Sequence, residues 1–140
     1  TRKGGLLYES YYISHISPCT HVLKEIIKDT HFPNRMQIFA AFGKFTAVLH
    51  ERGILHSDYS MGNVLFEPNE QGAQFQLVDL NRMQFGQKVN CRKGCRNFER
   101  IDTDVQALSA IARAYAQARG FDEEECIRLV LKMRWRKHKK

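Results

Sequence analysis

The segment GILHSDYSMGNVLF, residues 53–66, places His56, Asp58 and Asn63 between two apolar runs, and Asp79 ends a further apolar run in QLVDL. Magnesium prefers hard oxygen ligands, which the Asp79 carboxylate and the Asn63 amide oxygen can supply. Asp58 is then left to accept a hydrogen bond from an acceptor hydroxyl and to orient that hydroxyl toward a terminal phosphate. These residue types indicate phosphoryl transfer from a magnesium nucleotide.

Each of these residues also has an ordinary structural explanation. Asp58 could cap a turn, Asn63 could fill a left-handed backbone position, and Asp79 could end a strand. Their joint spacing within a helix, a loop and a hairpin is much rarer by chance than any one of them alone. The combination therefore favours the chemical interpretation.

A β-hairpin is the first element needed to position these side chains. NVLFEP, the polar turn NEQG and AQFQLVDL predict two antiparallel strands with apolar flanks. In a hairpin, the start of the first strand lies beside the end of the second. We therefore expect Asn63 and Asp79 to meet, with Asp58 on the loop that enters the first strand.

Helices are predicted on both sides of the hairpin. The segment from Asn34, a candidate N-cap, to Gly53 is expected to be an amphipathic helix. Its apolar residues recur with helical spacing at Ile38, Phe42, Phe45 and Leu49. We expect a shorter helix in HVLKEIIKD, broken by Pro33, and later helices in TDVQALSAIARAYAQAR and FDEEECIRLVL. One or two short strands are expected in GGLLYESYYIS.

Composition indicates one domain with a basic surface. The 140 residues are 43% hydrophobic and 26% charged, with 22 Lys and Arg against 15 acids, a net charge of +7. This excess favours anionic partners such as nucleotide phosphates, nucleic acid or an anionic membrane. No apolar stretch approaches the length that spans a bilayer, and the start lacks a signal-peptide core, so we expect an intracellular protein.

The four cysteines, Cys19, Cys91, Cys95 and Cys126, are too few and too scattered for a disulfide framework. We therefore expect free thiols. Cys91 and Cys95 stand four residues apart in CRKGC, which could supply two zinc ligands, but no second Cys or His pair at a matching interval completes a tetrahedral site. A zinc site is not expected.

LHERGILHSDYSMGNVLF followed by QLVDLN resembles the catalytic loop and metal-binding segment of the protein-kinase-like fold, in which H-x-D-x-x-x-x-N precedes a hairpin that ends in D-F-G. Within that fold, GGLLYESYYIS ahead of a hinge, the Gly62-Asn63 pair and DLNRM are most similar to the bacterial lipopolysaccharide core kinases, the Kdo and heptose kinase family. The resemblance implies an α+β fold, mainly the helical C-terminal lobe with a catalytic hairpin and a short N-terminal strand region.

The resemblance assigns roles position by position. Asp58 matches the catalytic aspartate, and Asn63 and Asp79 match the residues that bind magnesium, so ATP and Mg²⁺ are the implied cofactors. His56 matches the histidine that braces the catalytic loop. Asp104 is similar to the aspartate that begins the long buried helix and ties back to the loop.

Asp104 has both a rival and a simpler explanation. Asp102 stands close to the same helix start and is the rival candidate for the matching role. Both could instead be N-terminal helix acids favoured by the helix dipole.

Departures from the protein-kinase pattern bear on the substrate. Ser57 stands where regulated protein kinases carry an arginine, and Ser60 stands where they carry a lysine beside the terminal phosphate. Both differences weaken the case for a protein acceptor. Asn81 replaces the glycine after the metal-binding aspartate and is expected to adopt its positive φ, which asparagine tolerates best.

The sequence lacks the parts that cover and clamp nucleotide phosphates in this fold. No G-x-G-x-x-G loop and no strand lysine paired with a helix glutamate are present. We expect residues 1–14 to be the last strands of a truncated N-terminal lobe, residues 15–140 to be the kinase-like C-terminal lobe, and a further small domain to lie upstream. Alone, this chain is expected to be a weak or inactive enzyme.

Two basic stretches are candidates for contact with an anionic acceptor. The first provides candidate acceptor-binding residues Arg82, Lys88, Arg92, Lys93 and Arg96. Arginine forks suit the carboxylates and phosphates of a lipid-linked core sugar, although a solvated loop explains the same charges. The second, KMRWRKHKK, could rest on an anionic leaflet or be a solvated helix end.

We expect an ATP-dependent kinase lobe that phosphorylates a sugar hydroxyl, on Kdo or heptose, of lipopolysaccharide core. Its expected place is the cytoplasm, with peripheral contact at the inner face of the bacterial inner membrane, and no nucleic-acid partner is expected. The alternatives are an atypical protein Ser/Thr kinase lobe and a non-catalytic pseudokinase or basic binding module. Asp58, Asn63 and Asp79 argue against the pseudokinase, and the lack of an aromatic RNA-recognition motif argues against RNA.

Overall fold

The computed structural model describes residues 19–139. Helices and short antiparallel strands occur together along this part of the chain, so the expected α+β class is confirmed. The strands expected in residues 4–14, and with them the proposed remnant of an N-terminal lobe, lie outside the described residues.

The predicted hairpin is present as β3 (Val64–Asn69) and β4 (Gly72–Leu77), which pair from Val64 opposite Leu77 to Asn69 opposite Gly72. Alternate residues of β3 are buried, as expected for a strand with one face on the core. β1 (His21–Val22) extends this sheet on the β3 side. A second, two-stranded sheet joins β2 (Leu55–His56) to β5 (Met83–Gln84).

The first helix is shorter than its sequence pattern predicts. α2 spans Leu23–Lys28, because His21 and Val22 pair with β3 and so cannot be helical. Its end also comes before Pro33, at Asp29, which adopts an extended conformation. Proline is therefore not what ends this helix.

The long amphipathic helix is α3, Arg35–Glu51, and it begins and ends near the predicted residues. Asn34 stands at the N-cap position in a left-handed conformation, with φ 58°, and its side chain makes no capping hydrogen bond. Gly53 has φ 76°, the left-handed conformation that commonly follows a helix end. The predicted apolar stripe is buried in the core, with exposures of 0–3% at Ile38, Phe42, Phe45 and Leu49.

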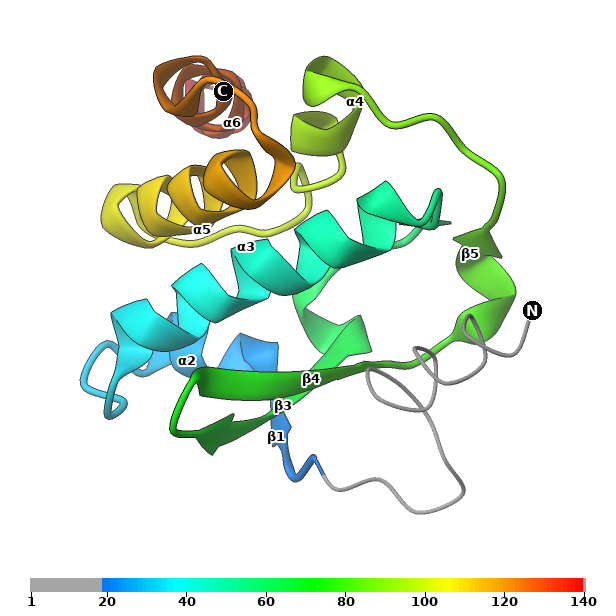
Figure 1. Cartoon of the computed structure of the whole chain (residues 1–140). Helices are drawn as coiled ribbons and strands as arrows, with labels where there is room; N and C mark the ends of the chain where they lie inside the picture. Colours follow the sequence, from blue (N-terminus) through cyan, green and yellow to red (C-terminus); the bar gives the residue numbers. More distant parts are fainter. Residues whose placement is uncertain (1–18, 140) are drawn as a thin grey trace.

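Two further helices pack on the side of α3 away from the hairpin. α5 spans Val105–Arg119 and lies along α3, and α6, Glu123–Lys139, packs on α5. Figure 1 shows the resulting order of layers, from the hairpin through α3 and α5 to α6. The helix α3 therefore packs against the hairpin on one side and against α5 on the other.

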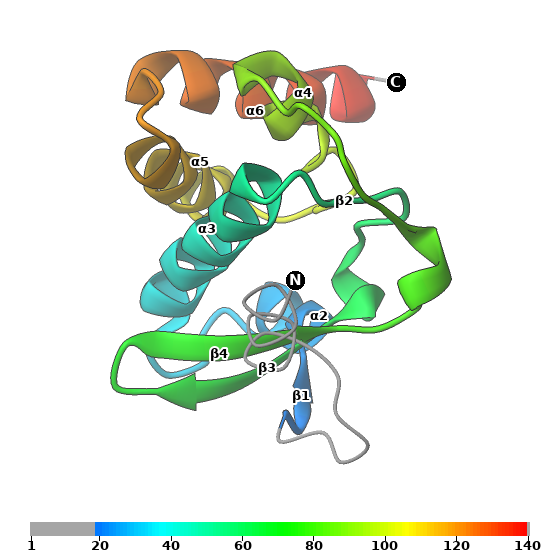
Figure 2. The ribbon, with the colours of Figure 1, turned by 45° about the vertical axis from the view of Figure 1, so that its right-hand side comes forward.

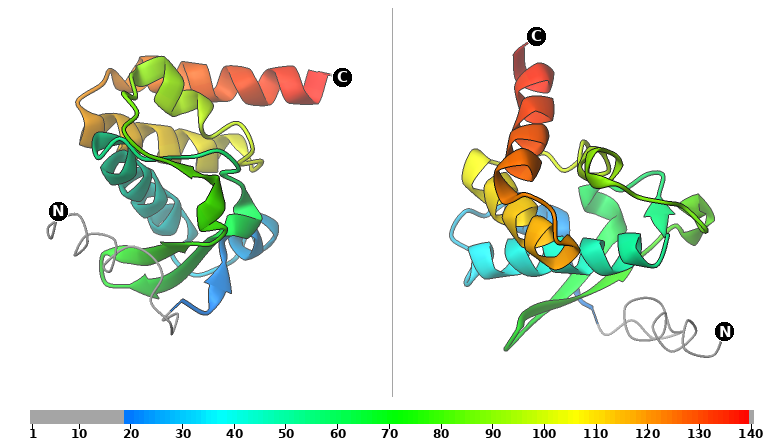
Figure 3. Two further views of the ribbon diagram at one scale, coloured as in Figure 1. Left: turned by 90° about the vertical axis from the view of Figure 1, so that its right-hand side faces the viewer. Right: turned by 45° about the horizontal axis from the view of Figure 1, so that its top comes forward.

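The short helix α4, Cys91–Arg96, lies against α6, as Figure 2 shows. The Asn90 side chain caps it by accepting a hydrogen bond from the Lys93 amide. The far end of α6 projects beyond the other helices (Figure 3). The 3₁₀ turns Met61–Asn63 and Leu80–Arg82 stand at the open end of the hairpin.

Candidate active site

The loop that carries Asp58 is anchored in the core by the residue next to it. Tyr59 is only 2% exposed, its ring stacks on that of Phe42 at 5.4 Å, and its hydroxyl shares a hydrogen bond with Thr46. Phe42 and Thr46 both belong to α3, so the longest buried helix fixes the middle of the loop. A hydrophobic tyrosine within HSDYSMGN is the sequence signal for this anchor.

His56 braces the same loop with both ring nitrogens. Its Nδ1 accepts a hydrogen bond from the Asp58 amide at 3.1 Å, so the Nε2 that lies 3.0 Å from the Val78 carbonyl oxygen must donate. This assigns the neutral Nε2–H tautomer. The ring therefore connects the loop that carries Asp58 to the residue that follows β4.

The two oxygens of the Asp58 carboxylate have different partners. Asp58 Oδ2 accepts a hydrogen bond from Asn63 Nδ2 at 3.2 Å, and the same amide nitrogen donates to the Asp58 carbonyl at 2.8 Å. Asp58 Oδ1 accepts from Arg100 Nη1 at 3.1 Å. The Asp58 side chain is 35% exposed, so one face of this carboxylate is open to a ligand.

Asn63 and Asp79 are brought near each other by the register of the hairpin. The Val78 amide donates to the Asn63 carbonyl at 3.0 Å, which continues the β3–β4 pairing by one step and puts Asp79 next to the residue opposite Asn63. Because the Asn63 amide nitrogen faces Asp58, its amide oxygen is turned elsewhere and is the atom that can face a cation.

Asp79 has φ 60°, a left-handed conformation that is uncommon outside glycine and that aspartate and asparagine adopt more readily than other residues. Uncommon backbone conformations of this kind cluster at functional sites. The expectation that Asn81 would take the positive φ is wrong, because Asn81 lies within the 3₁₀ turn Leu80–Arg82 and the left-handed residue of this turn is Asp79.

A buried chain of polar groups supports the loop from behind. Arg119 Nη1 donates to the Tyr115 hydroxyl at 2.8 Å, and that hydroxyl lies 2.7 Å from His50 Nδ1. His50 Nε2 lies 2.9 Å from Asn97 Oδ1, and Asn97 Nδ2 donates to the His56 carbonyl at 3.1 Å. The support of the loop thus extends across α3 to the end of α5.

Burial lowers the pKa of His50 to about 4, so its imidazole is neutral near pH 7. A neutral ring has one donor and one acceptor nitrogen. Since Asn97 Oδ1 only accepts, His50 Nε2 donates to it and His50 Nδ1 accepts from Tyr115. In this series of buried polar groups, each group therefore donates to the next, from Arg119 through Tyr115, His50 and Asn97 to the His56 carbonyl.

A family model described as the lipopolysaccharide kinase (Kdo/WaaP) family matches residues 19–124. The matched segment includes the site described above. The chain belongs to this family. The resemblance drawn from the catalytic-loop residues is confirmed, and with it the assignment to a family of kinases. No curated protein matches the chain.

The part matched by the lipopolysaccharide kinase family contains His56, Asp58, Asn63, Asp79 and Asp104. It ends within the first turn of α6, so most of that helix lies beyond it. None of the helices in residues 19–139 has the length and apolar composition needed to cross a membrane.

Asp104 has different partners from those expected of a residue that ties back to the catalytic loop. Its Oδ2 caps α5 by accepting from the Ala107 amide at 3.2 Å, and its Oδ1 accepts from Arg35 Nη2 at 2.8 Å. These contacts lower the pKa of the Asp104 carboxyl, even though burial acts to raise it. Asp104, rather than Asp102, is the N-cap, and it joins α5 to the start of α3.

The loop contacts expected of Asp104 are made by residues that the sequence analysis did not assign. Asn97 holds the His56 carbonyl, and Arg100 holds the Asp58 carboxylate. No motif singles them out, because both follow α4 in a stretch whose only visible feature is its positive charge. Contact with the loop becomes apparent only after the chain folds back.

The candidate acceptor-binding cations fall into separate groups. Arg92 and Arg96 line a groove of about 180 Å³ between α4 and α6. Arg82 Nε instead lies 3.8 Å from Asp79 Oδ2, Lys93 Nζ donates to Gln87 Oε1 at 3.1 Å, and Lys88 is exposed.

The groove gains three further cations from the face of α6 that packs near α4: Arg128, Lys132 and Arg136. Arg128 Nη2 lies 4.0 Å from Glu125 Oε2, an exposed pair of little strength. Five cations therefore surround one small groove. The sequence analysis missed this because α4 and α6 are far apart along the chain.

Proposed function

We propose that this chain carries the catalytic loop of an ATP-dependent kinase that phosphorylates a sugar hydroxyl, on Kdo or heptose, of lipopolysaccharide core. Membership of the lipopolysaccharide kinase family supports a phosphotransferase of this pathway. The observation that carries the residue assignment is the hydrogen bond between Asn63 Nδ2 and Asp58 Oδ2, at the open end of the hairpin where Asp79 also lies. A helical kinase-like C-terminal lobe is the arrangement we infer.

In this proposal Asp58 accepts the hydrogen bond of the sugar hydroxyl and aims its oxygen at the terminal phosphorus. Asn63 and Arg100 each hold one carboxylate oxygen, and Tyr59 and His56 hold the backbone on either side. A carboxylate oxygen has two lone pairs, so each retains acceptor capacity for the incoming hydroxyl. Catalysis through such a residue rests on positioning the reacting atoms.

Asn63 and Asp79 fit a magnesium nucleotide by the chemistry of their donors. An amide oxygen and a carboxylate at the end of one hairpin are the hard oxygen ligands that Mg²⁺ accepts together with phosphate oxygens. The left-handed backbone of Asp79, uncommon outside glycine, agrees with a functional role for this side chain. When bound, the ion neutralises charge on the phosphates and fixes their direction.

The groove between α4 and α6 is our candidate for holding the anionic groups of the acceptor. Its five cations, four of them arginines from α4 and α6 that can form paired hydrogen bonds, suit carboxylate and phosphate groups. Arg100 follows the end of α4 in sequence, and its side chain contacts the Asp58 carboxylate. Anionic groups bound near α4 would thus lie on the same stretch of chain as the proposed reaction centre.

The test compares Asp58→Asn and Asp79→Asn in the native gene product, with core oligosaccharide as acceptor. Asp58→Asn keeps the side-chain volume but removes the carboxylate, so we expect turnover to fall at least ~100-fold with little change in nucleotide affinity. Asp79→Asn is expected to weaken the binding of the magnesium nucleotide, measured by calorimetry with and without Mg²⁺.

Asp29→Asn is the matched control, because Asp29 lies exposed in a turn and bonds only locally, to the His31 amide. It should behave as the wild type. Near-normal turnover of Asp58→Asn would refute the role of Asp58. Phosphorylation of a protein but not of the saccharide would refute the substrate class.

A further inference from the structure

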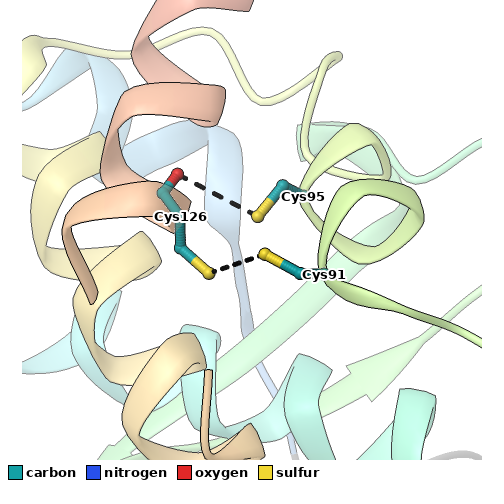
Figure 4. A group of neighbouring side chains, drawn as sticks. All are labelled: Cys91, Cys95 and Cys126. Atoms are coloured by element: carbon teal, nitrogen blue, oxygen red, sulfur yellow. Dashed lines mark hydrogen bonds between the residues drawn. The ribbon is translucent and has the colours of Figure 1, made fainter. Parts of the chain in front are cut away.

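Three of the four cysteines meet at the contact between α4 and α6, as Figure 4 shows. Cys91 and Cys95 lie one turn apart on α4, and Cys126 comes from α6. The sulfur atoms of Cys91 and Cys126 are 3.5 Å apart, and all three sulfur atoms lie within 4.8 Å of one another. The fourth cysteine, Cys19, lies elsewhere, with its thiol directed at the Gln74 carbonyl.

This spacing is close to what a tetrahedral zinc ion requires. A Zn–S bond of about 2.3 Å and a tetrahedral angle place two sulfur ligands about 3.8 Å apart. The three thiols therefore need only small side-chain movements to share one ion. Thiolates are soft ligands that select zinc over magnesium or calcium.

A candidate fourth ligand lies beside Cys91, namely the Glu125 carboxylate, which is not within 4.8 Å of all three sulfur atoms and has to turn toward them. Glu125 Oε1 lies 3.9 Å from Cys91 Sγ, and Glu125 is the neighbour of Cys126 at the start of α6. Its side chain is about half exposed and its other carboxylate oxygen makes only a 4.0 Å contact with Arg128, so it is free to turn toward an ion. Three thiolates and one carboxylate complete a closed tetrahedral site.

The electrostatic surroundings match the charge of such a site. Zn²⁺ with three thiolates and a carboxylate carries a net charge of −2, and Cys95 lines the groove that also holds five cations. Zinc binds cysteine as the thiolate, so zinc binding releases the protons of the thiols.

We propose that Cys91, Cys95, Cys126 and Glu125 form a structural zinc site that joins α4 to α6. The proposed ligands are separate from Asp58, Asn63 and Asp79, and the zinc site does not depend on the proposed function, although Cys95 lines the groove that we propose for the acceptor. Its consequence for the fold is specific, because α4 has six residues and is too short to be stable alone. The segment after α4 supplies Asn97 and Arg100, so zinc would also stabilise the support of the catalytic loop.

The test uses the reduced, metal-free chain under anaerobic conditions. The chain should bind one equivalent of Zn²⁺ and release roughly two or more protons per zinc bound. At a free zinc concentration about a hundred times Kd, Tm should rise by roughly 5–10 °C. Co²⁺ as a probe should give the intense visible bands of a tetrahedral ion and sulfur-to-cobalt charge transfer.

The variants separate the site from general thiol binding. Cys91→Ser, at the half-buried first position of α4, should lose the charge-transfer bands in part and weaken zinc binding at least tenfold, and Glu125→Gln should weaken it less. Cys19→Ala is the matched control and should bind zinc as the wild type does. If Cys126→Ser fails to fold, Cys91→Ser and the proton release of the wild type decide the question.

Three results would overturn the proposal. One is a wild-type chain that takes up less than a tenth of an equivalent of zinc or cobalt. A second is an unchanged cobalt spectrum in Cys91→Ser, and the third is a Cys19→Ala variant that loses the metal.

Discussion

His50 offers a sharp test of the buried polar chain behind the catalytic loop. Its ring is 3% exposed, accepts a hydrogen bond from Tyr115 and donates one to Asn97. Protonation would put a second donor where Tyr115 already donates, and would place a positive charge near Arg119. The folded protein should therefore resist protonation of this imidazole.

The size of the effect follows from the pKa of His50, which burial lowers from 6.5 to about 4. The positive charge of Arg119 acts in the same direction, and the hydrogen bond to Asn97 opposes it. Between these two pH values the unfolded chain binds a proton that the folded chain does not. The free energy of unfolding should thus fall as the pH drops through this window, by about 1.4 kcal/mol per pH unit and about 3 kcal/mol in all.

The assay is urea unfolding of the wild type and His50→Gln at a series of pH values from 7 to 4. At pH 7 the variant should be less stable by about 1–3 kcal/mol, because the glutamine amide does not reproduce the ring geometry that reaches Tyr115 and Asn97 together, and one buried partner is left unsatisfied. The two curves should converge as the pH falls, since only the wild type has this group to protonate. His31→Gln, the same change at an exposed position, should follow the wild type, and parallel curves for wild type and His50→Gln would refute the reasoning.

Two further predictions concern the helix contacts. Gly43→Ala should destabilise the fold by about 1–3 kcal/mol in urea unfolding, because a Cβ there would lie inside contact distance of the Ile111 carbonyl oxygen. This loss should outweigh the better helix propensity of alanine. Gly62→Ala, where a Cβ meets nothing within 4 Å, should be close to neutral. Charge reversal at Arg92 and Arg96 should weaken binding of phosphorylated core oligosaccharide at least about tenfold at low salt, but leave a neutral sugar unaffected. Lys88→Glu is the matched reversal outside the groove, and equal losses from all three changes would mean that only net charge matters.

The local elements could be predicted from the sequence because their signals are short in range. The hairpin was visible as two apolar runs around NEQG, and α3 as an apolar stripe between Asn34 and Gly53. The spacing of Asp58 and Asn63 indicated a protein-kinase-like catalytic loop, since such a loop is a local motif, and GGLLYESYYIS, the Gly62-Asn63 pair and DLNRM indicated the family. The start of α2 was mispredicted because β1 is defined by pairing with β3, a partner distant along the chain.

The support of the site was decided only by tertiary structure. Cys126 joins Cys91 and Cys95, Asn97 reaches His56, and Arg100 reaches Asp58, all across intervals where no periodicity links the partners. Side-chain contacts of this kind depend on how helices pack, and packing is set by the whole buried surface rather than by residue spacing. The sequence by itself therefore determined the family and the elements that carry the proposed reacting residues, whereas the fold decided which groups hold these residues in place and which thiols lie together.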